Sequence, residues 1–66
     1  MTIVVNGEER EVSPELTVKA LLGELGLDRD GVAVAVDRRV VPRSRHTQTR
    51  LEPGAQIEII RAVGGG

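Results

Sequence analysis

The 66-residue sequence contains no phenylalanine, tyrosine or tryptophan. Any hydrophobic core must therefore be aliphatic, built from Val, Ile, Leu and Ala, which pack in well-defined rotamers. The same absence removes the aromatic surfaces on which proteins stack nucleobases, sugars or flavins. Because 39% of the residues are hydrophobic, the composition is that of a folded chain, and its length allows one domain with one small core.

Cysteine is also absent, and His46 is the only histidine. These absences exclude a disulfide framework and a cysteine-based metal site, so we expect no metal and no bound cofactor. Small secreted domains usually need disulfides, which favours a cytoplasmic location. We see no signal sequence and no apolar run long enough for a membrane span, and the net charge of −1 argues against a nucleic-acid partner.

The charges are distributed unevenly along the chain. Acidic residues dominate positions 8–30, whereas positions 38–50 carry five arginines and His46. This asymmetry predicts two electrostatic faces on the folded domain. For most of these arginines we favour an ordinary solvated loop over a binding patch, and we expect His46 to be a surface or half-buried loop residue rather than a catalytic base.

The N-terminal segment has the pattern of a hairpin. Residues 2–5 and 8–12 read as strands, and Asn6-Gly7 between them is a strong turn signal because both residues tolerate positive φ. The second strand is largely polar, so we expect it at a sheet edge.

A helix is predicted next, with Thr17 as its N-cap and Gly26 at its C-terminal end. The helical spacing of apolar residues creates one stripe for the core, made of Val18, Leu21, Leu22 and Leu25.

The second half of the chain reads as three further strands. Residues 32–36 are a continuous apolar run, which suggests a strand covered on both faces. A turn and a short strand at 40–41 follow, then a polar loop over 43–50. Pro53-Gly54 is a turn signal before the last strand at 56–60.

This element order predicts an α+β fold, and the β-grasp (ubiquitin-like) topology is the natural solution. It would have a mixed sheet of four to five strands and one main helix, with the first and last strands adjacent and parallel at the sheet centre. We expect residues 1–63 to form this domain and residues 64–66 to be a flexible glycine tail.

The chain ends in Gly64-Gly65-Gly66, to which Arg61-Ala62-Val63 leads from the predicted strand at 56–60. Glycine has no Cβ, so such a tail is thin enough to enter a narrow tunnel in a partner enzyme. Its terminal carboxylate is ionised at neutral pH and a poor electrophile, and ATP would activate it most simply as an acyl-adenylate. The alternative is a frayed chain end without function.

The sequence resembles the ThiS family, the ubiquitin-like sulfur carriers of thiamine biosynthesis, over essentially its whole length. The resemblance is carried by Val5-Asn6-Gly7, Thr17 with Leu21-Leu22, the run Val32 to Val36, Val40-Val41-Pro42-Arg43 and the ending Ala62-Val63-Gly64-Gly65-Gly66. Two departures are His46, where the family often has Trp, and Gly54-Ala55 in place of the usual Gly-Asp.

The resemblance implies a carrier that is not itself an enzyme. A ThiF-like adenylyltransferase would use ATP to adenylate Gly66, sulfur from a persulfide donor would convert the adenylate to a thiocarboxylate, and a ThiG-like thiazole synthase would accept that sulfur. Gly64 and Gly65 would thread the partner's active site. We take Val40, Val41, Arg43 and Ile60 as candidate partner contacts, with a structural role for Arg43 equally open.

Two other functions remain open from the sequence. The chain could carry sulfur for molybdopterin or cysteine synthesis, because that chemistry would be identical and only the partner would differ. It could also be a ubiquitin-like modifier joined to lysines through Gly66. No catalytic constellation supports an enzyme in its own right.

Overall fold

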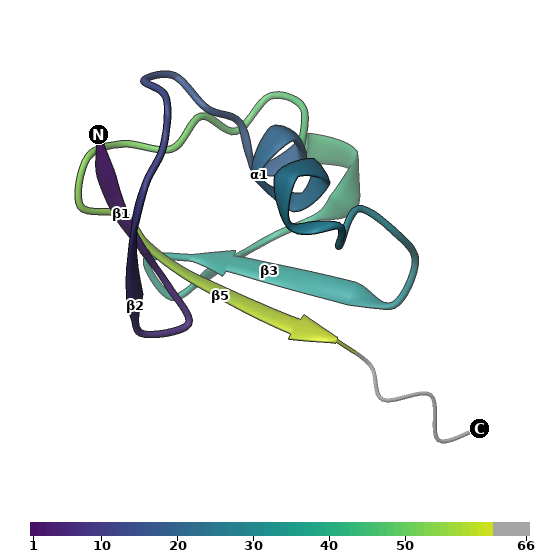
Figure 1. Ribbon diagram of the computed structural model, residues 1–66. Helices are drawn as coiled ribbons and strands as arrows, with labels where there is room; N and C mark the ends of the chain where they lie inside the picture. Colours follow the sequence, from purple (N-terminus) through teal and green to yellow (C-terminus); the bar gives the residue numbers. More distant parts are fainter. Residues whose placement is uncertain (62–66) are drawn as a thin grey trace.

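The computed structural model describes residues 1–61, which form one mixed β-sheet with an α-helix packed on one side (Figure 1). In chain order the elements are β1 (Thr2–Val5), β2 (Glu8–Glu11), α1 (Val18–Leu25), β3 (Val32–Val36), β4 (Arg39–Val41), a 3₁₀-helix (Arg43–Arg45) and β5 (Gln56–Arg61). The order of strands across the sheet is β2-β1-β5-β3-β4.

The last strand lies at the centre of the sheet. β5 runs parallel to β1, with Val5 opposite Ile57, and antiparallel to β3, with Val36 opposite the same Ile57. The α+β class, the β-grasp topology and the central parallel pair are thus confirmed. β2 is an edge strand with all four residues exposed, as its polarity predicts.

Two hairpins of the same type flank β5. Asn6-Gly7 joins β1 to β2, and Asp37-Arg38 joins β3 to β4. All four residues have positive φ, between 50° and 83°. Positive φ at both central residues defines a type I′ turn, whose twist matches that of the flanking strands.

Helix α1 begins and ends as predicted. The Thr17 hydroxyl accepts a hydrogen bond from the Ala20 N–H at 3.1 Å, and Gly26 adopts the left-handed conformation at φ 71°. The Leu27 N–H bonds the Leu22 carbonyl at 2.8 Å and the Gly26 N–H bonds that of Gly23 at 3.2 Å. This pair of bonds is a Schellman motif, which satisfies carbonyls that the helix end would leave open.

The core fills the space between α1 and one face of the sheet. Its buried members are all aliphatic: Ile3, Val12, Leu16, Val18, Leu21, Leu22, Val34, Leu51, Ala55, Ile57 and Ile59. Burying these side chains is the main force that holds helix and sheet together.

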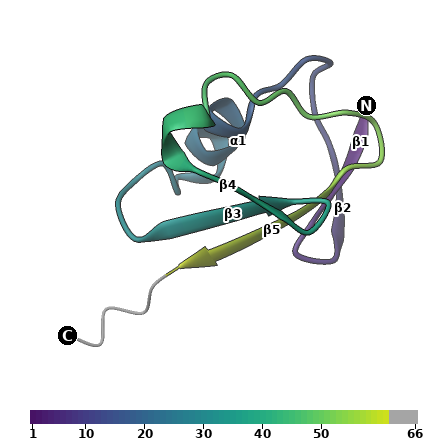
Figure 2. The ribbon, with the colours of Figure 1, turned by 180° about the vertical axis from the view of Figure 1, so that it is seen from behind.

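The expectation that residues 32–36 are covered on both faces is wrong. Val34 is 2% exposed, but Ala33 beside it is exposed and Ala35 is half-buried. Figures 1 and 2 show the helix on one side of the sheet only. Successive side chains of a strand point to opposite faces, so the valines of β3 face the helix and its alanines face away. An apolar run with alanine at alternate positions is therefore compatible with one-sided burial.

The polar loop predicted for residues 43–50 is more structured than expected. It opens with the 3₁₀-helix, and Arg50 forms an isolated bridge with Thr17. His46 is 5% exposed, so its assignment to the surface or to a half-buried position is wrong. The backbone explains this burial, since the Lys19 N–H donates to the His46 carbonyl at 3.0 Å and holds the segment against α1.

Candidate functional site

The three tail glycines, Gly64 to Gly66, lie outside the described residues, as does the proposed domain boundary at residue 63. The described chain ends at Arg61, which is the last residue of β5. The register with β3 continues to this point, where Val32 stands opposite Arg61. The described residues nearest to the tail, up to Arg61, therefore belong to the central strand of a packed sheet.

Two of the candidate contact residues share the face of the sheet that α1 does not cover. Val40 and Ile60 are the large hydrophobic residues exposed in the described part, at 75% and 63%. Val40 stands opposite Ala35 and Ile60 opposite Ala33, which places both pairs on the same face of β3. We call the surface made by Ala33, Ala35, Val40 and Ile60 the open-face patch.

The open-face patch also has a charged neighbour. Glu58 stands opposite Ala35 on the β5 side and is exposed, so a carboxylate lies within the apolar strip. Val40 and Ile60 were predicted as contact residues from the sequence, whereas the two alanines and Glu58 were not. Their positions could have been deduced from the sequence, because residues two apart along a strand share a face of the sheet. Placing Ile60 on the open face therefore also places Glu58 there.

The other two candidate contacts do not join this patch. Val41 stands opposite the buried Val34, so it faces the helix side and is half-buried. Arg43 begins the 3₁₀-helix, and its guanidinium donates to the Asp30 carboxylate at 2.8 Å. Both groups of that ion pair are exposed, at 59% and 101% of their side-chain surfaces, so the pair adds little to stability.

The acidic and basic segments of the chain meet in the structure. Arg43 pairs with Asp30, and Arg50 pairs with Glu15 at 3.3 Å. The two predicted electrostatic faces are therefore not fully separate, because two basic residues of 38–50 pair with acidic residues of 8–30.

Two carboxylates have lowered pKa values for local reasons. The Lys19 ammonium donates to Asp28 at 2.7 Å and holds the pKa of that carboxyl below its ordinary value. The pKa of Glu11 is also lowered, first because the Thr2 hydroxyl donates to it and then because of the N-terminal ammonium nearby. Both carboxylates belong to exposed residues.

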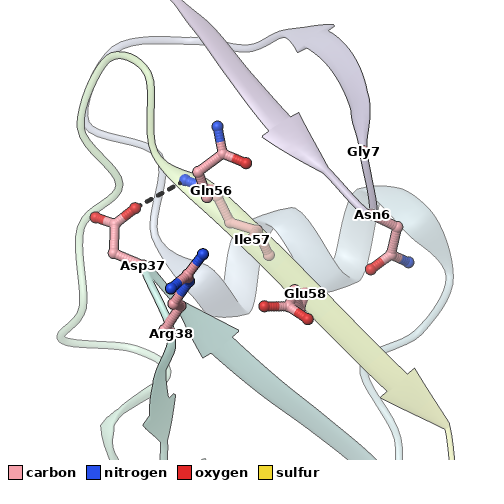
Figure 3. A pocket seen from close by; sticks show the side chains of 7 residues that line it. All are labelled: Asn6, Gly7, Asp37, Arg38, Gln56, Ile57 and Glu58. Carbon is pink, nitrogen blue, oxygen red and sulfur yellow. Dashed lines mark hydrogen bonds between the residues drawn. The ribbon is translucent and has the colours of Figure 1, made fainter.

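Both hairpin turns and the start of β5 line a shallow hollow (Figure 3). Its charged groups are Asp37, Arg38 and Glu58, and no serine, threonine or histidine lines it. Elsewhere in residues 1–61, no group of three or more His, Asp or Glu side chains is placed to hold a metal ion. The helix of this described region is also not long and apolar enough to cross a membrane.

His46 has a structural role in the described chain. Its Nε2 lies 3.0 Å from the Val41 carbonyl oxygen. A carbonyl can only accept, so Nε2 carries the proton and donates. The imidazole ring therefore connects the last residue of β4 to the segment that leads back towards α1.

Comparison with known proteins identifies close relatives over the whole chain. A family model described as the ThiS family matches residues 3–66. The sulfur carrier protein ThiS of Escherichia coli is 30% identical over 66 residues, which covers all of both chains. A crystal structure of the thiamine biosynthesis protein ThiS from Geobacter metallireducens superimposes with a TM-score of 0.85 at 29% identity and also covers both chains fully.

A thiazole synthase from Paramagnetospirillum magneticum is 47% identical over all 66 residues of the chain. The chain spans only 20% of the length of that relative. A second thiazole synthase, from Magnetococcus marinus, shows the same partial coverage at 35% identity. Among these relatives, similar sequences thus occur both as a separate protein and as one part of a longer chain.

Proposed function

The chain belongs to the ThiS family, and on this premise we propose that it is a sulfur carrier of thiamine biosynthesis whose reactive group is the Gly66 carboxylate. The observation that carries the proposal is the family match over residues 3–66, which includes the terminal glycines. The fold supports it, because the central strand β5 leads directly towards that end of the chain.

The proposed chemistry takes place at the end of the chain and uses no cofactor bound to the domain. A ThiF-like adenylyltransferase transfers AMP from ATP to Gly66 and releases pyrophosphate. The sulfur of a persulfide donor then attacks the acyl carbon and expels AMP. A thiol reduces the resulting acyl disulfide and leaves a thiocarboxylate. Gly64 and Gly65 lack a Cβ and so allow the tail to thread the partner's active site.

The acceptor that we propose is a ThiG-like thiazole synthase. Support comes from the two thiazole synthases that contain a stretch similar to this entire chain within their own sequences. A carrier and its acceptor act in sequence, so joining them in one chain raises their effective concentration. We place this chemistry in the cytoplasm, where ATP is available.

The open-face patch is the proposed docking surface for these enzymes. Val40 and Ile60 expose apolar side chains on the strands that flank β3, and exposed apolar surface on a small domain is typical of protein contacts. Arg43 remains a second candidate contact at the margin of the domain, whereas the placement of Val41 on the helix side favours a packing role.

An intact-mass experiment tests the function. The protein is incubated with the adenylating enzyme, ATP and a persulfide donor, and we expect the mass change for replacement of one terminal oxygen by sulfur. Deletion of Gly66 should abolish the change while circular dichroism stays that of the native fold, and Gly23→Ala, a glycine remote from the tail, should leave the change intact. Full sulfur loading after loss of both Gly65 and Gly66 would refute the proposal.

The same reaction distinguishes the remaining alternatives. Transfer of sulfur from the loaded protein to a thiazole synthase supports the thiamine pathway. Transfer only to a molybdopterin or cysteine-forming enzyme would retain the carrier chemistry but change the pathway. Adducts on lysines of other proteins would identify a modifier.

A further inference from the structure

Two turn residues hold β5 from opposite sides. Asn6 and Asp37 are each the first of the two central residues of a type I′ turn, and both have φ of 50°. Figure 3 shows their side chains on either side of β5. Each side chain makes hydrogen bonds to the β5 backbone, in addition to the strand pairing.

Asp37 acts at the beginning of β5. Its N–H donates to the Gln56 carbonyl at 2.8 Å, and its carboxylate accepts from the Gln56 N–H at 3.0 Å. Gln56 is the first residue of β5, so this contact fixes where the strand starts.

Asn6 acts further along the strand. Its N–H donates to the Ile57 carbonyl at 2.8 Å, which is the last rung of backbone pairing on the β1 side. Its side-chain oxygen then accepts from the Ile59 N–H at 2.8 Å, and its side-chain amide donates to the Ile59 carbonyl at 3.4 Å. The primary amide thus substitutes for one further residue of β1.

The Asn6 side chain matters here because β5 extends further along the sheet than its neighbour β1. Paired positions on the β1 side end with Val5 and Ile57, whereas pairing with β3 continues to Arg61. Within the described chain, the half of β5 nearest to the tail is therefore held by β3 on one flank and by the Asn6 side chain on the other.

We propose that Asn6 is a positioning residue, which acts through Ile59 to set the direction in which β5 presents the C-terminal residues to the adenylating enzyme. The inference rests on the proposed carrier function. Gly66 lies seven positions after Ile59, a distance of at most about 25 Å in a fully extended chain. A displacement of about 1 Å at a reacting group can cost a large factor in rate, so the orientation of the strand affects turnover.

Asn6 has two roles, one in the turn and one in the contact with Ile59, and substitutions can separate them. Asparagine favours the positive φ that the turn needs, and glycine at position 6 would supply the same φ without a side chain. Asn6→Gly therefore keeps the turn and removes both contacts with Ile59. Asn6→Asp keeps the turn and the acceptor for the Ile59 N–H, and it replaces the longer contact with a carboxylate oxygen that faces the Ile59 carbonyl.

The experiment measures amide exchange and adenylation kinetics on the intact protein with its adenylating enzyme. The matched control is Asp37→Gly, which removes the corresponding contact at Gln56, five positions before Arg61 instead of two. In Asn6→Gly we expect faster exchange of the Ile59 amide. We also expect kcat to fall about tenfold, equivalent to about 1.4 kcal/mol of activation free energy, with little change in KM because the open-face patch is intact.

The other variants should respond differently. Asn6→Asp should recover most of kcat, since it restores the 2.8 Å contact. Asp37→Gly should accelerate exchange at Gln56 and leave kcat within about twofold of the unmodified protein. The free energy of unfolding is measured for each variant, so that a loss of kcat can be distinguished from a loss of stability.

Several results would overturn the inference. One is a kcat that falls equally in Asn6→Gly and Asp37→Gly, in proportion to the stability that each variant loses. That result would show that Asn6 stabilises the fold and has no separate positioning role. Faster exchange at Ile59 with normal kcat would show that the contact exists but does not position the tail. If the unmodified protein is not adenylated at all, the proposed function itself fails, and that outcome is distinct from the other two.

Discussion

His46 donates a hydrogen bond from Nε2 to the carbonyl oxygen of Val41 at 3.0 Å, across the 3₁₀-helix that separates them in the chain. The ring is 5% exposed, and the His46 carbonyl in turn accepts from the Lys19 N–H in the first turn of α1. One residue therefore links the edge strand β4 to the helix on the other layer.

From this link we predict that His46→Ala destabilises the domain by about 2 kcal/mol, because it leaves a cavity and removes the donor for the Val41 carbonyl. Denaturant unfolding measures the loss. Thr47→Ala, at the exposed neighbouring position, serves as the control and should change stability by less than about 0.5 kcal/mol. A similar loss in both variants would contradict the structural role of His46.

Two glycines of the helix region should respond to alanine in opposite ways. Gly23 lies within α1, and a Cβ added there meets no atom within 4 Å. Gly23→Ala should therefore stabilise the domain by about 0.5–1 kcal/mol through helix propensity. Gly26 has φ 71°, so Gly26→Ala should cost about 1 kcal/mol. Thermal melts of the pair check the prediction, and a shift of both in one direction would count against the assigned cap.

The turn of the second hairpin contains backbone strain at Arg38 that a substitution can relieve. Arg38 has φ 69° at a turn position that favours glycine, whereas the first hairpin has Gly7 at the equivalent place. Arg38→Gly should raise the free energy of unfolding by about 1 kcal/mol, because it relieves the contact between Cβ and backbone. The matched change Gly7→Ala should lower it. Equilibrium unfolding in urea measures both effects, and destabilisation by Arg38→Gly would show that its side chain makes a contact worth more than the strain.

The Lys19–Asp28 pair predicts a pH effect of known sign. The pKa of Asp28 in the folded protein lies below its ordinary value of 3.8, chiefly because Lys19 donates to the carboxylate. The unfolded chain binds the proton more readily, so the pair's contribution to stability is complete above that ordinary value and is lost as pH falls through the folded pKa. In Lys19→Met, an NMR titration should show the Asp28 midpoint rising. An unchanged midpoint would mean that the contact does not persist in solution.

The open-face patch yields a functional prediction that is separable from stability. Val40→Ser and Ile60→Ser alter exposed side chains, so each should leave stability within about 0.5 kcal/mol of the original. Each should raise KM for the adenylating enzyme by about tenfold, since truncating a residue at the centre of a contact surface costs more than about 1 kcal/mol. Val41→Ser, on the helix side, should instead lower stability. If KM rises only in Val41→Ser, the docking surface lies elsewhere.

Local patterns in the chain identify most of the elements. Asn6-Gly7, the Thr17 cap and Gly26 mark a hairpin and both ends of a helix, and each signal depends only on neighbouring residues. The candidate site was partly accessible in the same way, because Val40 and Ile60 are apolar residues of predicted strands. The error at residues 32–36 arose because a run of Val and Ala does not specify how many faces a partner layer covers.

The buried position of His46 was not accessible from sequence, since a polar segment between two strands gives no sign that its backbone will bond to α1. The second role of Asn6 was hidden for a related reason. The Asn-Gly pattern accounts fully for a turn, and the contact with Ile59 joins residues 53 positions apart.

The sequence by itself determined the aliphatic core, the order of the elements and the family, because composition, short-range turn and capping chemistry and the order of motifs are properties of the linear chain. Only the tertiary structure decided which sheet face stays open, that His46 is buried, and that Asn6 and Asp37 hold β5 from both sides. These features depend on which distant segments pack together, and that choice is made by burial of the whole core rather than by any local preference.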